Sequence, residues 1–107
     1  MNKLETGVFL QPHPAKVHKG GEDAALVTDN IIAVADGVGG WADSGVDPAK
    51  YSRQLCQNFD ILIAKDEKKE KGVYIQDPRR LLIDSVELTQ ETGSCTCCVA
   101  SLDLEEP

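Results

Sequence analysis

Residues 31–41 read IIAVADGVGGW, a β-compatible apolar segment (residues 31–35) that runs directly into Asp36 and a glycine-rich stretch. Residues 23–28, just before it, are also β-compatible, and Asp29-Asn30 between the two segments is a two-residue turn signal. The two segments therefore predict a β-hairpin. Residues 36–45 are rich in glycine and show no apolar period, which predicts a loop whose backbone takes conformations that other residues avoid.

Two helices are expected after this loop. Asp47-Pro48 opens the first, with Asp as N-cap and Pro at the first helical position, and the apolar residues between positions 55 and 63 recur at helical spacing. Asp77-Pro78 opens the second helix in the same way, and Gly93 is expected to end it. Residues 65–71 are all Lys, Asp or Glu, which predicts a solvated helix end or loop without chemistry of its own.

Two further strands are expected, one near each end of the chain. Residues 7–10 are a short apolar run that is closed by two prolines, and residues 94–102 follow the second helix. Strands that can pair antiparallel, together with helices segregated from them, predict an α+β fold in which both helices cover one face of the sheet. A chain of 107 residues is expected to form no more than one domain.

Composition excludes some classes of partner. The net charge of -7 argues against nucleic-acid and anionic-membrane partners, because both need a clustered basic surface. No stretch reaches the roughly 18 apolar residues that span a bilayer, and the N-terminus lacks a signal-peptide pattern, so we expect a soluble, cytoplasmic chain. Only Cys95 and Cys97 share a strand face with each other, so the cysteines do not suit a disulfide framework. Buried thiols are the favoured interpretation, and a thiolate metal site is the alternative.

The densest chemical feature is a set of carboxylates. The start of the hairpin's first strand lies beside the end of its second, so Glu22, Asp23 and Asp36 are expected to share one sheet edge. Like charges so close repel one another unless a cation neutralises them, which favours a divalent metal with oxygen ligands, Mn²⁺ or Mg²⁺. Gly37 lets its own carbonyl turn inward as a further ligand. The alternative is a plain Asp-Gly hairpin turn beside a solvated Glu-Asp loop.

A short basic stretch precedes the Glu-Asp pair. Lys16, His18 and Lys19 lie there, and they would supply positive charge to a substrate phosphate beside the metals. The alternative is that these three residues are exposed loop residues.

Four motifs, taken in order, resemble one known family. KGGEDA at residues 19–24, VADGVGGW at 34–41, GVDP at 45–48 and GSCT at 93–96 look like the metal-dependent protein phosphatases of the protein phosphatase 2C family, most similar to its mitochondrial-type branch. The resemblance covers nearly the whole chain. It implies a four-layer α/β/β/α sandwich of antiparallel sheets, of which residues 1–107 are the N-terminal part, with the C-terminal part absent. It also adds a mitochondrial location as the alternative to the cytoplasm.

The resemblance assigns roles to the acidic residues. Asp36 matches the family's metal-bridging aspartate, and Gly37 matches the residue whose carbonyl ligates one of two Mn²⁺ or Mg²⁺ ions. Glu22 matches the acidic residue that holds metal-bound water, and Asp23 is its neighbour in the same site. The implied activity is that of a protein serine/threonine phosphatase, in which a metal-bridging hydroxide attacks a phosphoserine or phosphothreonine protein.

Two departures from the family pattern are visible. His18 occupies the position at which the family has a phosphate-clamping arginine. Lys16 or Lys19 would substitute for that arginine, but a lysine lacks its bidentate geometry. The family's later aspartates, which complete the metal site, lie beyond this chain. The alternative function is therefore a truncated, catalytically inactive phosphatase-like binding module or subunit of a larger assembly. Half a sandwich leaves an apolar sheet face uncovered, which predicts association with a complementary chain or self-association.

Overall fold

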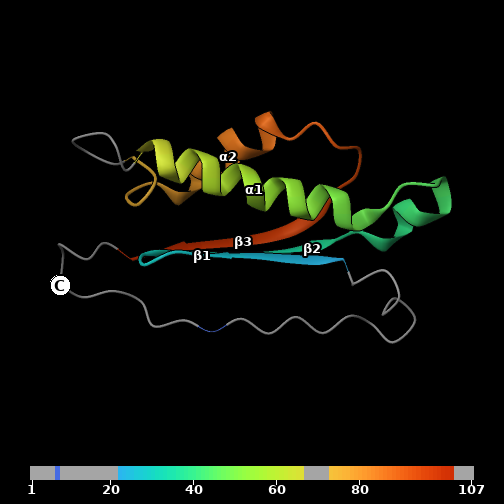
Figure 1. The fold of residues 1–107 in the computed structure, drawn as a ribbon, viewed down its shortest axis with the longest axis horizontal. Coiled ribbons are helices and arrows are strands. Elements are labelled where there is room, and N and C mark those ends of the chain that lie inside the picture. The colour runs from blue at the N-terminus through green and yellow to red at the C-terminus, as the bar shows by residue number, and fades with distance from the viewer. Residues whose placement is uncertain (1–6, 8–21, 67–72, 103–107) are drawn as a thin grey trace.

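The computed structural model describes residue 7, residues 22–66 and residues 73–102. In chain order, these residues form strands β1 (Asp23–Val27) and β2 (Ile31–Gly37), the 3₁₀ helix η2 (Gly39–Ser44), helices α1 (Pro48–Asp66) and α2 (Pro78–Leu88), and strand β3 (Cys95–Ser101). The strands form one antiparallel sheet in the order β1-β2-β3. Both helices lie on the same face of this sheet (Figure 1), which confirms the predicted α+β arrangement. None of the described helices is long and apolar enough to cross a membrane.

The predicted hairpin is confirmed as β1 and β2. Thr28 closes its turn, since its N–H donates to the Ile31 carbonyl (2.8 Å) and its Oγ1 accepts from the Ile31 N–H (2.9 Å). The register sets the Cα of Asp23 opposite that of Asp36.

The prediction of a loop was wrong for most of residues 36–45. Asp36 and Gly37 belong to β2, because β3 pairs with them through Thr96 and Cys95. Residues 39–44 then form η2, which ends at Gly45 in a left-handed conformation with φ 78°. Among the described glycines of this stretch, Gly45 has a positive φ and Gly37 does not.

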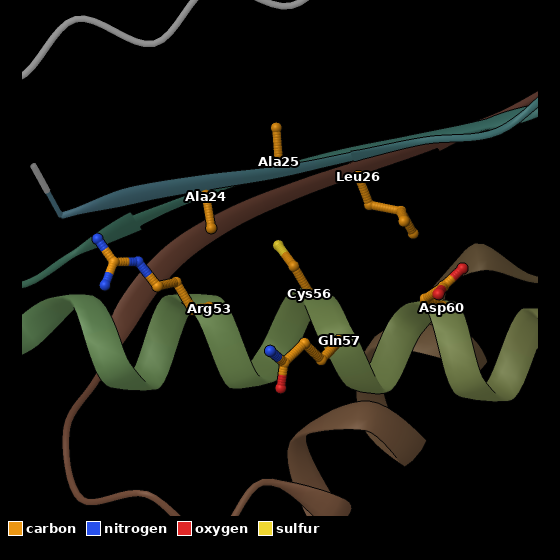
Figure 2. A pocket seen from close by; sticks show the side chains of 7 residues that line it. All are labelled: Ala24, Ala25, Leu26, Arg53, Cys56, Gln57 and Asp60. Atoms are coloured by element: carbon orange, nitrogen blue, oxygen red, sulfur yellow. The ribbon is translucent and has the colours of Figure 1, made fainter. Parts of the chain in front are cut away.

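The two faces of the sheet have different surroundings. In β2, Ile31, Ala33 and Ala35 are buried toward the helices, while Ile32 and Val34 point the other way and are 36% and 52% exposed. Alternation along β1 is visible in Figure 2, where Ala24 and Leu26 point toward α1 and Ala25 points away. The outward residues of β2 thus form an apolar face that none of the described helices or strands covers.

Helix α1 forms most of the core with the sheet. Its start is as predicted, because the Asp47 carboxylate accepts from the Ala49 N–H (3.0 Å). Leu55, Phe59 and Ile63 recur at helical spacing and are buried against the sheet. Alanines on the facing strands keep side chains short there, which lets the helix approach the sheet closely.

Helix α2 starts where the sequence predicts and ends earlier. Its N-cap Asp77 accepts from the Arg80 N–H (3.2 Å), as expected. The helix stops at Leu88 and not near Gly93, because the Gln54 side chain of α1 accepts from the N–H groups of Gln90 (2.7 Å) and Glu91 (2.8 Å) and holds the chain in a non-helical path.

The charged run at residues 65–71 is only partly described. Lys65 is exposed at the end of α1, as expected, but Asp66 is 5% exposed. Its two carboxylate oxygens accept from the N–H groups of Val73 and Tyr74, each at 3.0 Å. Asp66 is therefore a buried cap for the chain that leads to α2, which corrects the prediction of a solvated residue. The rest of the run lies outside the described residues, as does the predicted strand at residues 7–10 apart from Gly7.

Candidate active site

The acidic edge, by which we mean Glu22, Asp23 and Asp36, lies at the open end of the hairpin. Asp23 and Asp36 are directly opposed across the antiparallel pair, and both are exposed on the face away from the helices. Directly opposed side chains have Cβ atoms about 5 Å apart, and like charges at that separation destabilise a sheet. This pair therefore presents two carboxylates, which are oxygen ligands of the kind that a hard divalent cation prefers, at one end of the hairpin.

Hydrogen bonds to its backbone carbonyl hold Glu22 in place. Its carbonyl accepts two hydrogen bonds, from the N–H of Gly37 (3.1 Å) and from Oγ of Ser52 in α1 (2.7 Å). Glu22 thus sits one residue before β1, opposite Gly37, and next to the Asp23–Asp36 pair. The structure brings the three predicted acidic residues to one end of the hairpin, with Asp23 opposed to Asp36 and the Glu22 backbone bonded to Gly37.

Residue 37 must be a glycine, because backbone atoms of two other residues approach it closely. A Cβ atom built on it would lie 2.7 Å from the Pro48 carbonyl oxygen and 2.9 Å from the Glu22 carbonyl oxygen, and side chains essentially never make contacts that short. The glycine therefore lets the first turn of α1 and the residue before β1 both pack against the end of β2. Sequence reasoning singled out Gly37 for its carbonyl, and this packing role is an additional one.

The segment that follows the acidic edge is tied to β3. The Val38 N–H donates to the Ser94 carbonyl (3.0 Å), and Nε1 of Trp41 donates to Oγ of the same serine (2.8 Å). Both bonds bridge more than fifty positions of sequence, from the start of η2 to the residue before β3. They hold the chain as it leaves Gly37, so the end of β2 is fixed on both sides.

The donors at the acidic edge suit a hard divalent cation in kind but not in number. Carboxylate and carbonyl oxygens are the ligands that Mg²⁺ and Mn²⁺ prefer. Within residues 7, 22–66 and 73–102, however, no three His, Cys, Asp or Glu side chains are arranged to hold a metal ion. The described part of the chain therefore presents an opposed pair of carboxylates and not a closed metal cage. Lys16, His18 and Lys19 lie outside the described residues.

The cysteines form no competing site. All four are free, and Cys95 and Cys97 lie partly buried on the helix-facing side of β3. Cys98 is exposed on the other face, because neighbouring residues of a strand point to opposite sides, and this corrects the expectation of a buried thiol there. Burial raises the pKa of the Cys56 thiol to about 11 and that of Cys97 to about 12. Such thiols stay protonated at neutral pH and are poor nucleophiles. Among the described residues, no cysteine belongs to a group of three that could hold a metal ion.

Cys56 also lines a cavity of about 320 Å³ between β1 and α1. In Figure 2 the Cys56 sulfur points toward β1, and the side chains of Arg53 and Asp60 lie on either side of it along α1. The cavity contains one protonated thiol and an isolated charge of each sign, which is not a catalytic constellation. The acidic edge is therefore the candidate site.

Two residues of this region were missed by sequence reasoning, Ser52 and Ser94. Ser52 did carry a signal, because it lies three residues before Leu55 on the apolar stripe of α1, where a polar side chain needs a buried partner. Ser94 lies in the GSCT motif, but no local pattern paired it with Val38 and Trp41, which are distant in sequence.

The fold and the opposed carboxylates define an α+β protein with an acidic site at one end of an antiparallel sheet. None of the protein-family models compared matches the chain. Several individual proteins do match the chain. The chain is 39% identical over 103 residues to "Probable protein phosphatase 2C 26" of Arabidopsis thaliana, covering 94% of this chain and 33% of that protein. It is 40% identical over 103 residues to "Probable protein phosphatase 2C 1" of Oryza sativa subsp. japonica, covering 94% of this chain and 29% of that protein.

A solved structure is similar as well. The chain matches the "X-ray structure of the photosystem II phosphatase PBCP" with a TM-score of 0.77 and 38% identity, over 89% of this chain and 36% of the other. Over most of its own length, the chain is therefore similar to proteins named protein phosphatase 2C and to a solved phosphatase structure. The chain spans between about a fifth and a third of the length of these curated relatives, from 21% to 33%.

Proposed function

We propose that these residues are part of a metal-dependent protein serine/threonine phosphatase in which Asp36 is the central ligand of the metal site. The observation that supports the proposal most directly is the register of the hairpin, which sets Asp36 opposite Asp23 beside the Glu22 backbone. The similarity to proteins named protein phosphatase 2C supports the reaction class. The proposed substrate is a phosphoserine or phosphothreonine protein.

Within this proposal, each residue has a distinct role. Asp36 would bind Mn²⁺ or Mg²⁺ through its carboxylate and Gly37 through its carbonyl, with Glu22 and Asp23 orienting water beside them. When bound, the ions supply an activated water and positive charge for the phosphoryl oxygens. The chain's own contribution is rigid placement, because hydrogen bonds from α1 and from the residue before β3 fix both sides of the acidic edge.

The test is phosphatase activity of the full-length gene product. We expect it to hydrolyse p-nitrophenyl phosphate and phosphothreonine peptides when Mn²⁺ is added and not in excess EDTA. Asp36→Asn keeps the size of the side chain and should abolish the Mn²⁺-dependent rate. Equal rates for the two proteins would contradict the assignment of Asp36.

The alternative is a catalytically inactive phosphatase-like binding module. The observation in its favour is that no described group of side chains is complete enough to hold a metal. A folded full-length gene product that hydrolyses neither substrate when Mn²⁺ is added would select this alternative.

A further inference from the structure

Ser52 lies in α1, outside the acidic edge, yet makes its shortest hydrogen bond to it. The side chain is fully buried, and Oγ lies 2.7 Å from the Glu22 carbonyl oxygen and 3.2 Å from that of Ala49, three residues earlier in the same helix. A serine inside a helix commonly bonds back to its own helix. Here the shorter bond goes to a residue thirty positions away, so it is a tertiary contact.

That contact fixes more than one atom. The carbonyl oxygen of Glu22 belongs to the planar peptide unit that also contains the nitrogen and Cα of Asp23. Two donors, Ser52 Oγ and the Gly37 N–H, hold this oxygen from α1 and from β2. Holding the oxygen therefore fixes the orientation of the whole unit, from which both acidic side chains project.

We propose that Ser52 is a positioning residue for the metal site, acting through the Glu22–Asp23 peptide and not through contact with metal or substrate. The proposal rests on the proposed function, since it assumes that the acidic edge binds Mn²⁺. Of the two donors described here, removal of the Ser52 hydroxyl leaves the Gly37 N–H on the Glu22 carbonyl oxygen. The Glu22–Asp23 peptide unit can then tilt. Groups that hydrogen-bond metal ligands contribute about 10- to 100-fold to metal affinity, and we expect the lower end of that range here because Ser52 acts through a peptide unit.

The chain offers a matched control in Ser85. This serine is also fully buried in a helix, α2, but its Oγ has no hydrogen-bond partner. Ser52→Ala and Ser85→Ala therefore remove the same atom from equally buried helical positions. They differ in whether that atom holds the acidic edge.

The experiment is calorimetric titration of the full-length gene product with MnCl₂ at a temperature well below the thermal midpoint of each metal-free variant. We expect Ser52→Ala to bind Mn²⁺ about tenfold more weakly than wild type and Ser85→Ala to bind as wild type does. Equal Mn²⁺ affinity for the two alanine variants would overturn the positioning role. A fall in thermal stability without a fall in affinity would also overturn it, because a merely structural serine would give that result.

Two further variants keep the outcome decisive. If Ser52→Ala does not fold, Ser52→Cys fills the same space with a weak donor, and wild-type Mn²⁺ affinity in that variant would overturn the proposal. Asp36→Asn separates this proposal from the proposed function. Unchanged Mn²⁺ binding by Asp36→Asn refutes the proposed function, whereas loss of binding there with full binding in Ser52→Ala refutes only the role of Ser52.

Discussion

Replacing Gly37 with alanine should disturb the junction between β2 and α1. The new Cβ would lie 2.7 Å from the Pro48 oxygen, 2.9 Å from the Glu22 oxygen and 3.2 Å from the Pro48 carbonyl carbon. All three are backbone atoms, so no side-chain rotation can relieve the contacts. Ordinary contact begins at 3.4 Å, so the strand end and the helix start must separate by about 0.7 Å, the difference between 3.4 and 2.7 Å. Overpacking of this kind costs about 2–3 kcal/mol of unfolding free energy.

The assay is urea unfolding of the full-length gene product, followed by circular dichroism. Gly40→Ala is the control, because a Cβ at Gly40 would meet nothing within 4 Å, and its unfolding free energy should change by no more than about 0.5 kcal/mol. If Gly37→Ala proves as stable as Gly40→Ala, the close approach of Pro48 and Glu22 to Gly37 is not a real constraint and the packing argument fails.

Two further predictions concern buried groups away from the acidic edge. Asp66→Asn should lower the unfolding free energy by about 2 kcal/mol, because an amide can accept only one of the two bonds from the Val73 and Tyr74 N–H groups. A change below about 0.5 kcal/mol in urea unfolding would contradict the role of Asp66 as a buried cap. Burial raises the pKa of the Cys56 thiol from 9.0 to about 11. The stability that the protonated thiol contributes is therefore complete below pH 9 and is lost as pH rises through 11. The unfolding free energy of Cys56→Ala should accordingly depend less steeply on pH over that range than that of the wild type. At neutral pH iodoacetamide should label Cys56 far more slowly in the folded protein than in urea-unfolded protein, as followed by mass spectrometry, and equal labelling rates in the two states would refute the buried placement of Cys56.

The features that sequence predicted correctly depend on local signals. Asp29-Asn30 marks the hairpin turn, and the Asp-Pro pairs at 47–48 and 77–78 mark both helix starts, because capping and turn chemistry involve residues a few positions apart. The hairpin in turn made it possible to predict that Asp23 and Asp36 would lie together.

The features that it missed depend on distant residues. β2 extends through Gly37 because β3 pairs with it, although β3 begins at Cys95. The early end of α2 depends on Gln54, more than thirty positions before the residues it holds. The contact between Ser52 and Glu22 is of the same type, since no local pattern says which carbonyl a buried serine will reach.

The central claim is that Asp36 binds the metal on which activity depends. The direct measurement is Mn²⁺ binding to the metal-free full-length gene product, compared among wild type, Asp36→Asn and Asp43→Asn. Asp43 is an exposed carboxylate in η2 outside the acidic edge, so it controls for the loss of one negative charge. We predict that Asp43→Asn binds Mn²⁺ as wild type does and that Asp36→Asn loses tight binding. Wild-type Mn²⁺ affinity in Asp36→Asn would contradict the account.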